Sequence, residues 1–133
     1  MAILIDSSVW INFFKGVSSP AVKTLENLIE REEDVGISDI ILTEILQGFR
    51  DDKEYRFALD HLLSFSIYTL KDTNSYIKAA QIYRACRKNG ITIRKTIDCL
   101  IAQIAIENGL VLLHEDVDFD RIATVCPLNV YSI

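Results

Sequence analysis

The sequence feature that most constrains the fold is the opening stretch, in which an apolar run at residues 2–5 stops at the carboxylate of Asp6. Three consecutive aliphatic residues predict a short buried strand, because the run is too brief for a helix. In an open parallel sheet with helices on both faces, functional groups gather just beyond the carboxyl ends of the strands. Asp6 is therefore a candidate site residue, provided that other acids of the chain reach the same edge.

Short apolar runs and amphipathic segments alternate along the rest of the chain. Further strands are expected at residues 35–38, 66–70, 110–113 and 128–133, the last of them at a sheet edge. Helices are expected at residues 9–15, 20–34, 39–46, 51–65, 73–88 and 97–108, with a short helical turn at 121–123. This alternation predicts an α/β fold, a three-layer sandwich in which helices flank a mainly parallel central sheet.

Helical spacing also predicts which side chains face the core. From the helix at 51–65, the residues expected to point inward are Tyr55, Leu59, Leu62 and Leu63. From the helix at 73–88, they are Tyr76, Ala79, Ala80, Tyr83 and Cys86. His61 has polar neighbours and is expected at the surface, and Asp39 is expected to cap the helix that it begins.

Length and composition set the broad class of the protein. The 133 residues fit one domain, residues 1–133, and half of them are hydrophobic, which is enough for a sizeable core. A net charge of −5 argues against a generally basic nucleic-acid binder, although metal ions can neutralise acids where a phosphate backbone binds. Cys86, Cys99 and Cys126 form no close pair and have no neighbouring His, a pattern typical of reduced thiols in a cytoplasmic protein. The sequence shows neither a signal peptide nor an apolar stretch of the roughly 20 residues that span a membrane, so no membrane association is expected.

Further acids interrupt apolar surroundings. Glu44 lies on or beside the apolar face of its helix, Asp98 lies in the first turn of a nearly all-apolar helix, and Asp116 and Asp118 follow an apolar strand. Simpler explanations exist, because Glu44 can reach water from the edge of the apolar stripe and Asp98 complements the helix dipole. A doubly wound fold nevertheless brings strand ends and helix starts to one edge, so we expect these acids to lie together with Asp6.

Several carboxylates at one place repel each other unless a divalent cation holds them. Oxygen ligands without His or thiolate favour Mg²⁺ or Mn²⁺ over zinc. Such a site suits hydrolysis of phosphodiester bonds, because a bound ion lowers the pKa of a water molecule and stabilises the leaving oxygen. The acidic pattern therefore indicates metal-dependent nuclease chemistry.

Four segments in this order resemble the PIN-domain nucleases, and specifically the VapC-type toxins of bacterial toxin–antitoxin pairs. They are residues 3–8, 37–48, 98–102 and 112–119, so the resemblance spans nearly the whole chain. It implies a PIN-like fold and a Mg²⁺- or Mn²⁺-dependent endoribonuclease that hydrolyses RNA in the cytoplasm. It also implies that the protein is the toxin of a type II pair and commonly a homodimer.

The resemblance assigns roles to individual residues. The catalytic and metal-binding acids would be Asp6, Glu44, Asp98 and Asp116, with Asp118 as an auxiliary metal ligand. Ser7 or Ser8 matches the family's hydroxyl after the first acid, which positions water or a ligand. Where this chain has His114, members of the family usually carry Thr or Ser. His114 therefore orients a ligand, contacts RNA or is only a hydrogen-bonded neighbour.

Basic and aromatic side chains suggest where partners bind. Contacts with RNA phosphates are expected from some of Arg84, Arg87, Lys88, Arg94 and Lys95, although the first three also suit the dipole of the helix that they end. The family is neutralised by a small antitoxin that lies along a groove beside the active site. Candidates for that groove are the exposed members of the group Trp10, Phe13, Phe14 and Phe49.

Three other functions are compatible with such a fold. A catalytically silent PIN-like domain would serve as a protein-binding module, but it would have no use for the full acid set. A phosphorylated receiver domain would need a Lys at a later strand end, whereas Lys71 comes too early in strand order. A nuclease acting on DNA 5′ ends would need additional segments that a chain of this length lacks.

Overall fold

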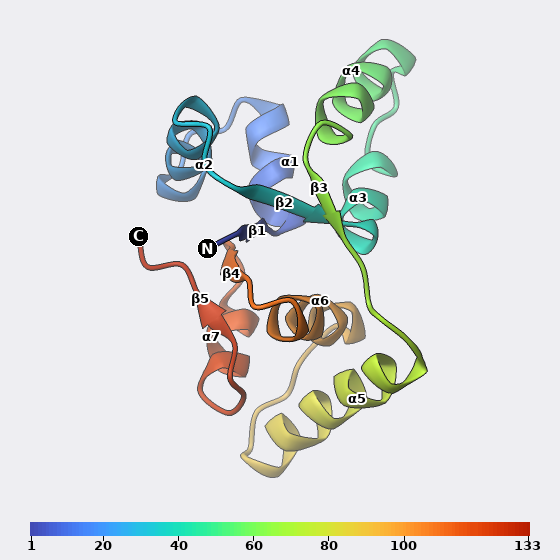
Figure 1. The fold of residues 1–133 in the computed structure, drawn as a ribbon, viewed down its shortest axis with the longest axis vertical. Coiled ribbons are helices and arrows are strands. Elements are labelled where there is room, and N and C mark those ends of the chain that lie inside the picture. The colour runs from blue at the N-terminus through green and yellow to red at the C-terminus, as the bar shows by residue number, and fades with distance from the viewer.

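The structure, a computed structural model, describes residues 1–133 and contains five strands and seven helices (Figure 1). The strands are β1 (Ile3–Ile5), β2 (Val35–Ser38), β3 (Ser66–Tyr68), β4 (Val111–Leu113) and β5 (Asn129–Val130). They form one sheet in the order β3-β2-β1-β4-β5, and every pairing is parallel. The predicted α/β fold with a mainly parallel sheet is confirmed, and β5 lies at an edge as predicted.

Every predicted helix is present. The helices are α1 (Ser7–Lys15), α2 (Pro20–Glu30), α3 (Asp39–Leu46), α4 (Asp52–Leu62), α5 (Thr73–Lys88), α6 (Thr96–Glu107) and α7 (Val117–Ala123). The helical turn predicted at 121–123 is the end of α7, which begins earlier because Asp116 caps it. No helix combines the length and the apolar character needed to cross a membrane.

The strand order reverses at the centre of the sheet. The connections through α1–α2 and α3–α4 lead outward from β1 to β2 and β3, whereas α5–α6 bring the chain back to β4 on the other side of β1. Figure 1 accordingly shows α1, α2 and α4 on one side of the sheet and α5, α6 and α7 on the other, and α3 packs against α1 and α4. The carboxyl ends of β1 and β4 thus mark the place where open α/β sheets bind ligands.

The core forms because the central strands and α6 are apolar on nearly every side. Leu4, Ile5 and Leu112 are completely buried, as strands covered by helices on both faces require. From α6, a continuous run from Ile101 to Ala105 is buried, which agrees with its nearly all-apolar sequence. This packing fixes the start of α6 against the ends of β1 and β4.

The helix ends follow their local sequence with one difference. The expected Asn-Gly endings of α5 and α6 are present, with Gly90 and Gly109 at φ angles of 76° and 65° that favour glycine. The cap of α3 is Ser38 and not Asp39, because Ser38 keeps the extended backbone of β2 and its Oγ accepts a hydrogen bond from the Ile41 N–H at 3.0 Å. Asp39 instead lies in the first turn of α3, where its charge suits the helix dipole.

Two of the four residues predicted to point inward from α4 are exposed. Leu62 is fully buried and Leu59 half-buried as predicted, whereas Tyr55 and Leu63 are exposed. Leu63 follows the end of the helix, so helical spacing no longer sets its direction. The buried face of α4 is therefore narrower than the sequence pattern indicates.

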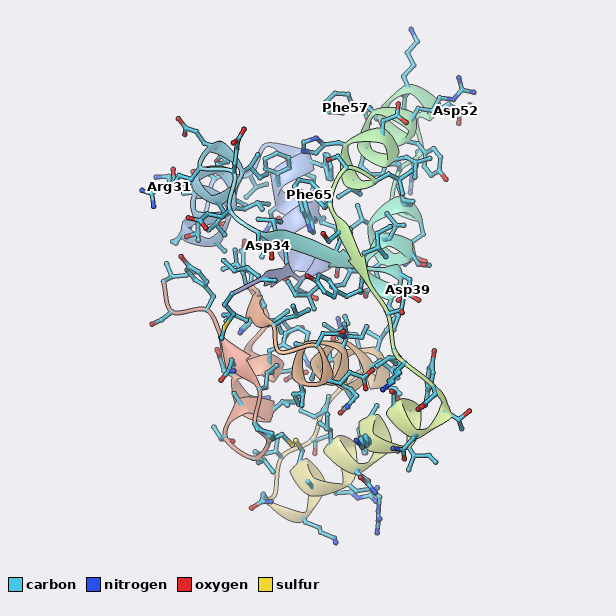
Figure 2. All side chains as sticks on the ribbon, viewed as in Figure 1. Arg31, Asp34, Asp39, Asp52, Phe57 and Phe65 are labelled. Carbon is cyan, nitrogen blue, oxygen red and sulfur yellow. The ribbon has the colours of Figure 1, made fainter.

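His61 was predicted at the surface, and this prediction is wrong. Its ring lies nearly parallel to those of Phe13 and Phe57, at centroid distances of 6.2 and 6.3 Å, and 6.3 Å from that of Trp10. Its Nε2 is buried without a hydrogen-bond partner, while Phe57 projects from α4 at one end of the molecule (Figure 2). The polar neighbours of His61 in the sequence do not indicate this packing, because most of the rings that it contacts come from α1 and from the segment after α4.

The buried face of α5 is rotated from the predicted one. Ala79 and Cys86 are buried and Tyr83 is half-buried, but Tyr76 and Ala80 are exposed. Tyr76 lies in the first turn of α5, where exposure keeps its hydroxyl in water and avoids an unsatisfied polar group in the core.

Candidate active site

Asp6 stands at the carboxyl end of β1 and caps α1. Its Oδ2 accepts hydrogen bonds from the Ser8 backbone N–H at 3.1 Å and from the Ser8 hydroxyl at 2.6 Å. The side chain is buried, and this burial raises the pKa of Asp6 above its ordinary value although the hydrogen bonds from Ser8 oppose the change. The local fold therefore fixes one carboxylate at the end of the central strand.

Glu44 reaches the same place from α3. The Ser7 hydroxyl donates a hydrogen bond of 3.0 Å to Glu44 Oε1. Partial burial raises the pKa of Glu44 and the nearby charge of Asp6 adds to this, while the hydrogen bond from Ser7 lowers it. The two adjacent hydroxyls thus have separate partners, because Ser8 orients Asp6 and Ser7 orients Glu44.

Asp98 lies in the first turn of α6 and is only 3% exposed. Its Oδ2 is buried and has no hydrogen-bond partner. Burial, together with the charges of Asp116, Asp6 and Asp118, raises the pKa of Asp98 to about 7, while Lys95 opposes the shift. A buried carboxylate oxygen without a partner is costly, so this atom is the one that most needs a cation or a proton.

Asp116 and Asp118 follow β4. Asp116 caps α7 by accepting the Asp118 N–H on Oδ1 at 3.0 Å, and Asp118 is completely buried. Carboxylate oxygens of Asp98, Asp116 and Asp118 all lie within 4.8 Å of one another. This hard, all-oxygen set fits Mg²⁺ or Mn²⁺, and Asp98 also has an oxygen without a hydrogen-bond partner.

The five predicted acids lie at one edge of the sheet, but they are not equally close to one another. Asp98, Asp116 and Asp118 are close enough to share one ion. Asp6 stands beside them, since its charge raises the pKa of both Asp98 and Glu44. Glu44 lies beyond Asp6, on the side of α3.

Basic side chains already neutralise part of this acidic edge. Arg94 donates from Nε to Asp118 Oδ2 at 3.2 Å and from Nη2 to Asp116 Oδ1 at 3.3 Å. Arg121 donates from Nη1 to Asp118 Oδ1 at 3.3 Å, and Lys95 Nζ lies 3.9 Å from Asp116 Oδ2. Both oxygens of Asp118 are therefore held by arginines and both oxygens of Asp116 have basic neighbours, whereas Asp98 Oδ2 has no hydrogen-bond partner and is the most available to an ion.

Sequence reasoning missed Arg121 and Glu115. The spacing of Asp118 and Arg121, three residues apart on one helix, is a signal that could have identified the first. Glu115 accepts hydrogen bonds from Asn12 at 3.2 Å and from Ser19 at 2.8 Å, which ties the loop after β4 to α1 and to the start of α2. No sequence signal announces these contacts, because the partners are about one hundred residues apart.

His114 is built into the turn that presents Asp116. Its Nδ1 accepts the Asp116 backbone N–H at 3.0 Å, so the proton must lie on Nε2, which donates to Asp120 Oδ1 at 3.1 Å. The ring packs 5.2 Å from that of Phe119 and its side chain is 6% exposed. Of the three possibilities that the sequence left open, these contacts favour a hydrogen-bonded neighbour that positions an acid.

The other predicted RNA contacts lie apart from the acids. Arg87 and Lys88 are exposed in the last turn of α5, and neither has a contact with the acidic edge. The Arg87 guanidinium lies 5.7 Å from the centre of the Tyr83 ring. Their role in RNA binding stays a prediction.

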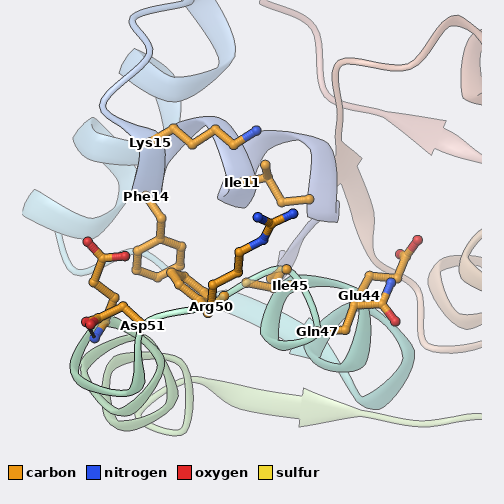
Figure 3. Close-up of a pocket in the computed structure, with 11 residues that line it drawn as sticks. Ile11, Phe14, Lys15, Glu44, Ile45, Gln47, Arg50 and Asp51 are labelled. Carbon is orange, nitrogen blue, oxygen red and sulfur yellow. Dashed lines mark hydrogen bonds between the residues drawn. The ribbon is translucent and has the colours of Figure 1, made fainter.

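An open cavity of about 750 Å³ lies next to the acids, between α1 and the connection from α3 to α4 (Figure 3). We call it the α1–α3 cavity; its lining includes Phe14, Lys15, Glu44, Phe49, Arg50 and Asp51. Of the four aromatic residues predicted for a partner groove, Trp10 is fully buried and so cannot serve. Phe13 packs on the ring of His61, which leaves Phe14 and Phe49 on the cavity wall.

Comparison with known proteins identifies the family. The family model described as the PIN domain matches residues 3–125. The chain therefore belongs to the PIN domain family.

Individual relatives narrow this class. The chain is 36% identical to Ribonuclease VapC11 of Mycobacterium tuberculosis over 132 residues, which cover 98% of each chain. Among solved structures, it is similar to VapBC2 from Rickettsia felis bound to a promoter DNA fragment, with a TM-score of 0.77, 20% identity and 98% coverage of both chains. It is also similar to VapBC-1 from nontypeable Haemophilus influenzae, with a TM-score of 0.74, 18% identity and coverage of 99% and 98%. At these low identities the structural likeness shows the fold.

Proposed function

We propose that this protein is a metal-dependent endoribonuclease and the toxin of a type II toxin–antitoxin pair. Membership of the PIN domain family and 36% identity to Ribonuclease VapC11 support this activity. The single observation that carries the chemistry is the group Asp98, Asp116 and Asp118, each of which offers a carboxylate oxygen within 4.8 Å of the others.

The metal site is assigned to Asp98 and Asp116, with Asp6, Glu44 and Asp118 around it. A Mg²⁺ or Mn²⁺ ion bound there would lower the pKa of a water molecule and stabilise the leaving oxygen of the phosphodiester. Asp118 contributes mainly by holding Arg94 and Arg121, because both of its oxygens are engaged by them.

Proton transfer is assigned to Glu44. The carboxylate is half-buried and oriented by Ser7, and burial raises its pKa toward the range in which a general base is most effective. Asp6 is fixed by Ser8 and adds negative charge that keeps a cation in the site. His114 keeps Asp116 in place through the backbone N–H of that residue.

The partners follow from the same surface. Arg94 and Lys95 would contact RNA phosphates beside the acids, and Arg87 and Lys88 would contact phosphates farther along the RNA. An antitoxin segment would use Phe14 and Phe49 as apolar anchors, with Phe13 behind them. Homodimer formation and a cytoplasmic location complete the proposal.

The test compares the chain with Asp6→Asn on total RNA in Mg²⁺, in Mn²⁺ and in EDTA. Removing the Asp6 charge weakens ion binding, so we expect cleavage by the unmodified protein in either metal and its loss on mutation or chelation. Equal cleavage by both proteins would instead indicate contamination. Together with failure to bind metal, it would favour the alternative, a catalytically silent PIN-like domain that binds a protein partner.

A further inference from the structure

We propose that the α1–α3 cavity is a nucleotide subsite, in which Lys15 and Arg50 bind a phosphate of the RNA strand next to the one that is cut. The inference rests on the proposed ribonuclease function and extends it to residues outside the acidic edge. The cavity volume of about 750 Å³ lies within the range of about 300–1,000 Å³ found for small-ligand sites. Glu44 belongs both to the acidic edge and to the cavity lining, so the two are continuous.

The two cations of the cavity are uncommitted. Neither Lys15 nor Arg50 makes an ion pair or a side-chain hydrogen bond, in contrast to Arg94, which holds two aspartates. Lys15 has a structural use, because it ends α1 and suits the helix dipole. Arg50 lies between α3 and α4 and has no such use, yet its guanidinium extends into the cavity toward the side where Lys15 lies (Figure 3).

The rest of the lining suits one nucleotide. Phe14 and Phe49 are half-buried and their rings meet edge to face, with centroids 5.6 Å apart, which leaves ring surface for a base to stack on. The lining carries three acids, Glu44, Asp51 and Glu54. Asp51 lies at the opposite end of the cavity from Glu44, with Arg50 between them (Figure 3). A phosphate is repelled from both acidic ends and attracted to the middle, where the cations are.

The test measures RNA binding and cleavage by the double variant Lys15→Ala with Arg50→Ala. A labelled single-stranded RNA is bound in Ca²⁺, with gels to check that it stays intact, and is cleaved in Mg²⁺ or Mn²⁺. Loss of the cations that hold this one phosphate should weaken binding on the order of tenfold at moderate salt and make the slope of log Kd against log salt shallower by about 0.7. KM should rise by a similar factor with a smaller change in kcat.

The matched control is Lys23→Ala with Arg31→Ala, which removes the same charge from exposed positions on and after α2 that do not line the cavity; Arg31 is labelled in Figure 2. The exchanged variant Lys15→Arg with Arg50→Lys should keep the binding. Equal binding and cleavage by the cavity variant and the control would overturn the inference and leave the cavity to the antitoxin segment alone. If the unmodified protein cleaves no RNA in either metal, it is the proposed function that fails.

Discussion

At Asp98, the stability of the fold and the proposed function require opposite charge states: a protonated carboxyl is favoured in the folded chain without metal, whereas binding of an ion requires the carboxylate. Its carboxyl is buried beside other acids, and its pKa of about 7 means that the folded chain without metal favours the protonated form below pH 7. An unfolded chain would release that proton near the ordinary value of 3.8. The stability that protonation provides is therefore complete below about pH 4 and is lost as the pH rises through 7.

The variant Asp98→Asn should separate these demands. Without metal, the free energy of unfolding of the unmodified protein should fall between pH 5 and pH 8, and the variant should lose less. At pH 8 we expect the variant to be more stable by on the order of 2 kcal/mol while its RNA cleavage is abolished. Urea unfolding at both pH values checks this, with the exposed Asp60→Asn as control. A variant that is less stable at pH 8 would contradict the burial argument.

Arg94 competes with a metal ion for the same carboxylates. Its guanidinium bonds both Asp116 and Asp118, so it acts as a cation of the site. The variant Arg94→Gln should bind Mn²⁺ several-fold more tightly and RNA more weakly, because one positive charge is removed from both contacts. Calorimetric titration with Mn²⁺ and anisotropy with RNA measure the two effects. The affinities of Arg94→Lys for Mn²⁺ and for RNA should lie between those of the unmodified protein and of Arg94→Gln. If Arg94→Gln binds Mn²⁺ no more tightly than the unmodified protein, the competition is refuted.

Among the elements, β2 depends on a glycine. A Cβ atom built at Gly36 would lie 2.4 Å from Tyr68 Cε2 and 2.8 Å from Cδ2, on the neighbouring strand β3. Gly36→Ala should therefore lower the free energy of unfolding by about 1–3 kcal/mol as the ring is displaced.

A double-mutant cycle identifies the cause. In the background Tyr68→Ala, the further change Gly36→Ala should cost much less, because the ring that it meets is gone. Thermal and urea unfolding of the four proteins give the coupling free energy. Additive costs would mean that the glycine is needed for another reason.

The positions of the helices and strands were largely predictable from sequence, but the side chains by which the helices face the core were only partly predictable. Apolar runs that stop at acids identified β1 and β4, because a buried strand needs apolar side chains on both faces. The inward faces of α4 and α5 were partly wrong, since amphipathic spacing gives an average direction and Tyr76 or Leu63 depends on the neighbouring element. His61 was missed for the same reason: most of its partner rings come from outside its own helix.

At the scale of the whole molecule, the gathering of acids followed from topology. Parallel strands and the helices between them bring Asp6, Asp98 and Asp116 to one edge, because the order of the strands reverses at β1. The roles of Arg94 and Glu115 did not follow, because side chains that meet across long stretches of sequence leave no periodic trace. The sequence analysis predicted a groove with Phe14 and Phe49, but not the cations Lys15 and Arg50 of the α1–α3 cavity, since its walls belong to separate helices.

Metal binding should stabilise the whole fold, because the acids come from elements on both sides of the strand reversal. An ion that binds only the folded chain adds about 2.7 kcal/mol when its free concentration is one hundred times Kd. We expect Mn²⁺ to raise the Tm of the unmodified protein and of Asp60→Asn, and to have little effect on Asp98→Asn. An equal rise in all three would show that the ion binds elsewhere.

The reversal of strand order also determines when the acidic site can form during synthesis of the chain. The first strand must wait for β4, over one hundred residues later, before its partner on that side exists. A growing chain on the ribosome that has not yet reached Asp116 carries Asp6, Glu44 and Asp98 but no complete ion site. The proposed cleavage of RNA therefore cannot begin before β4 and the acids that follow it have been synthesised and β4 has paired with β1.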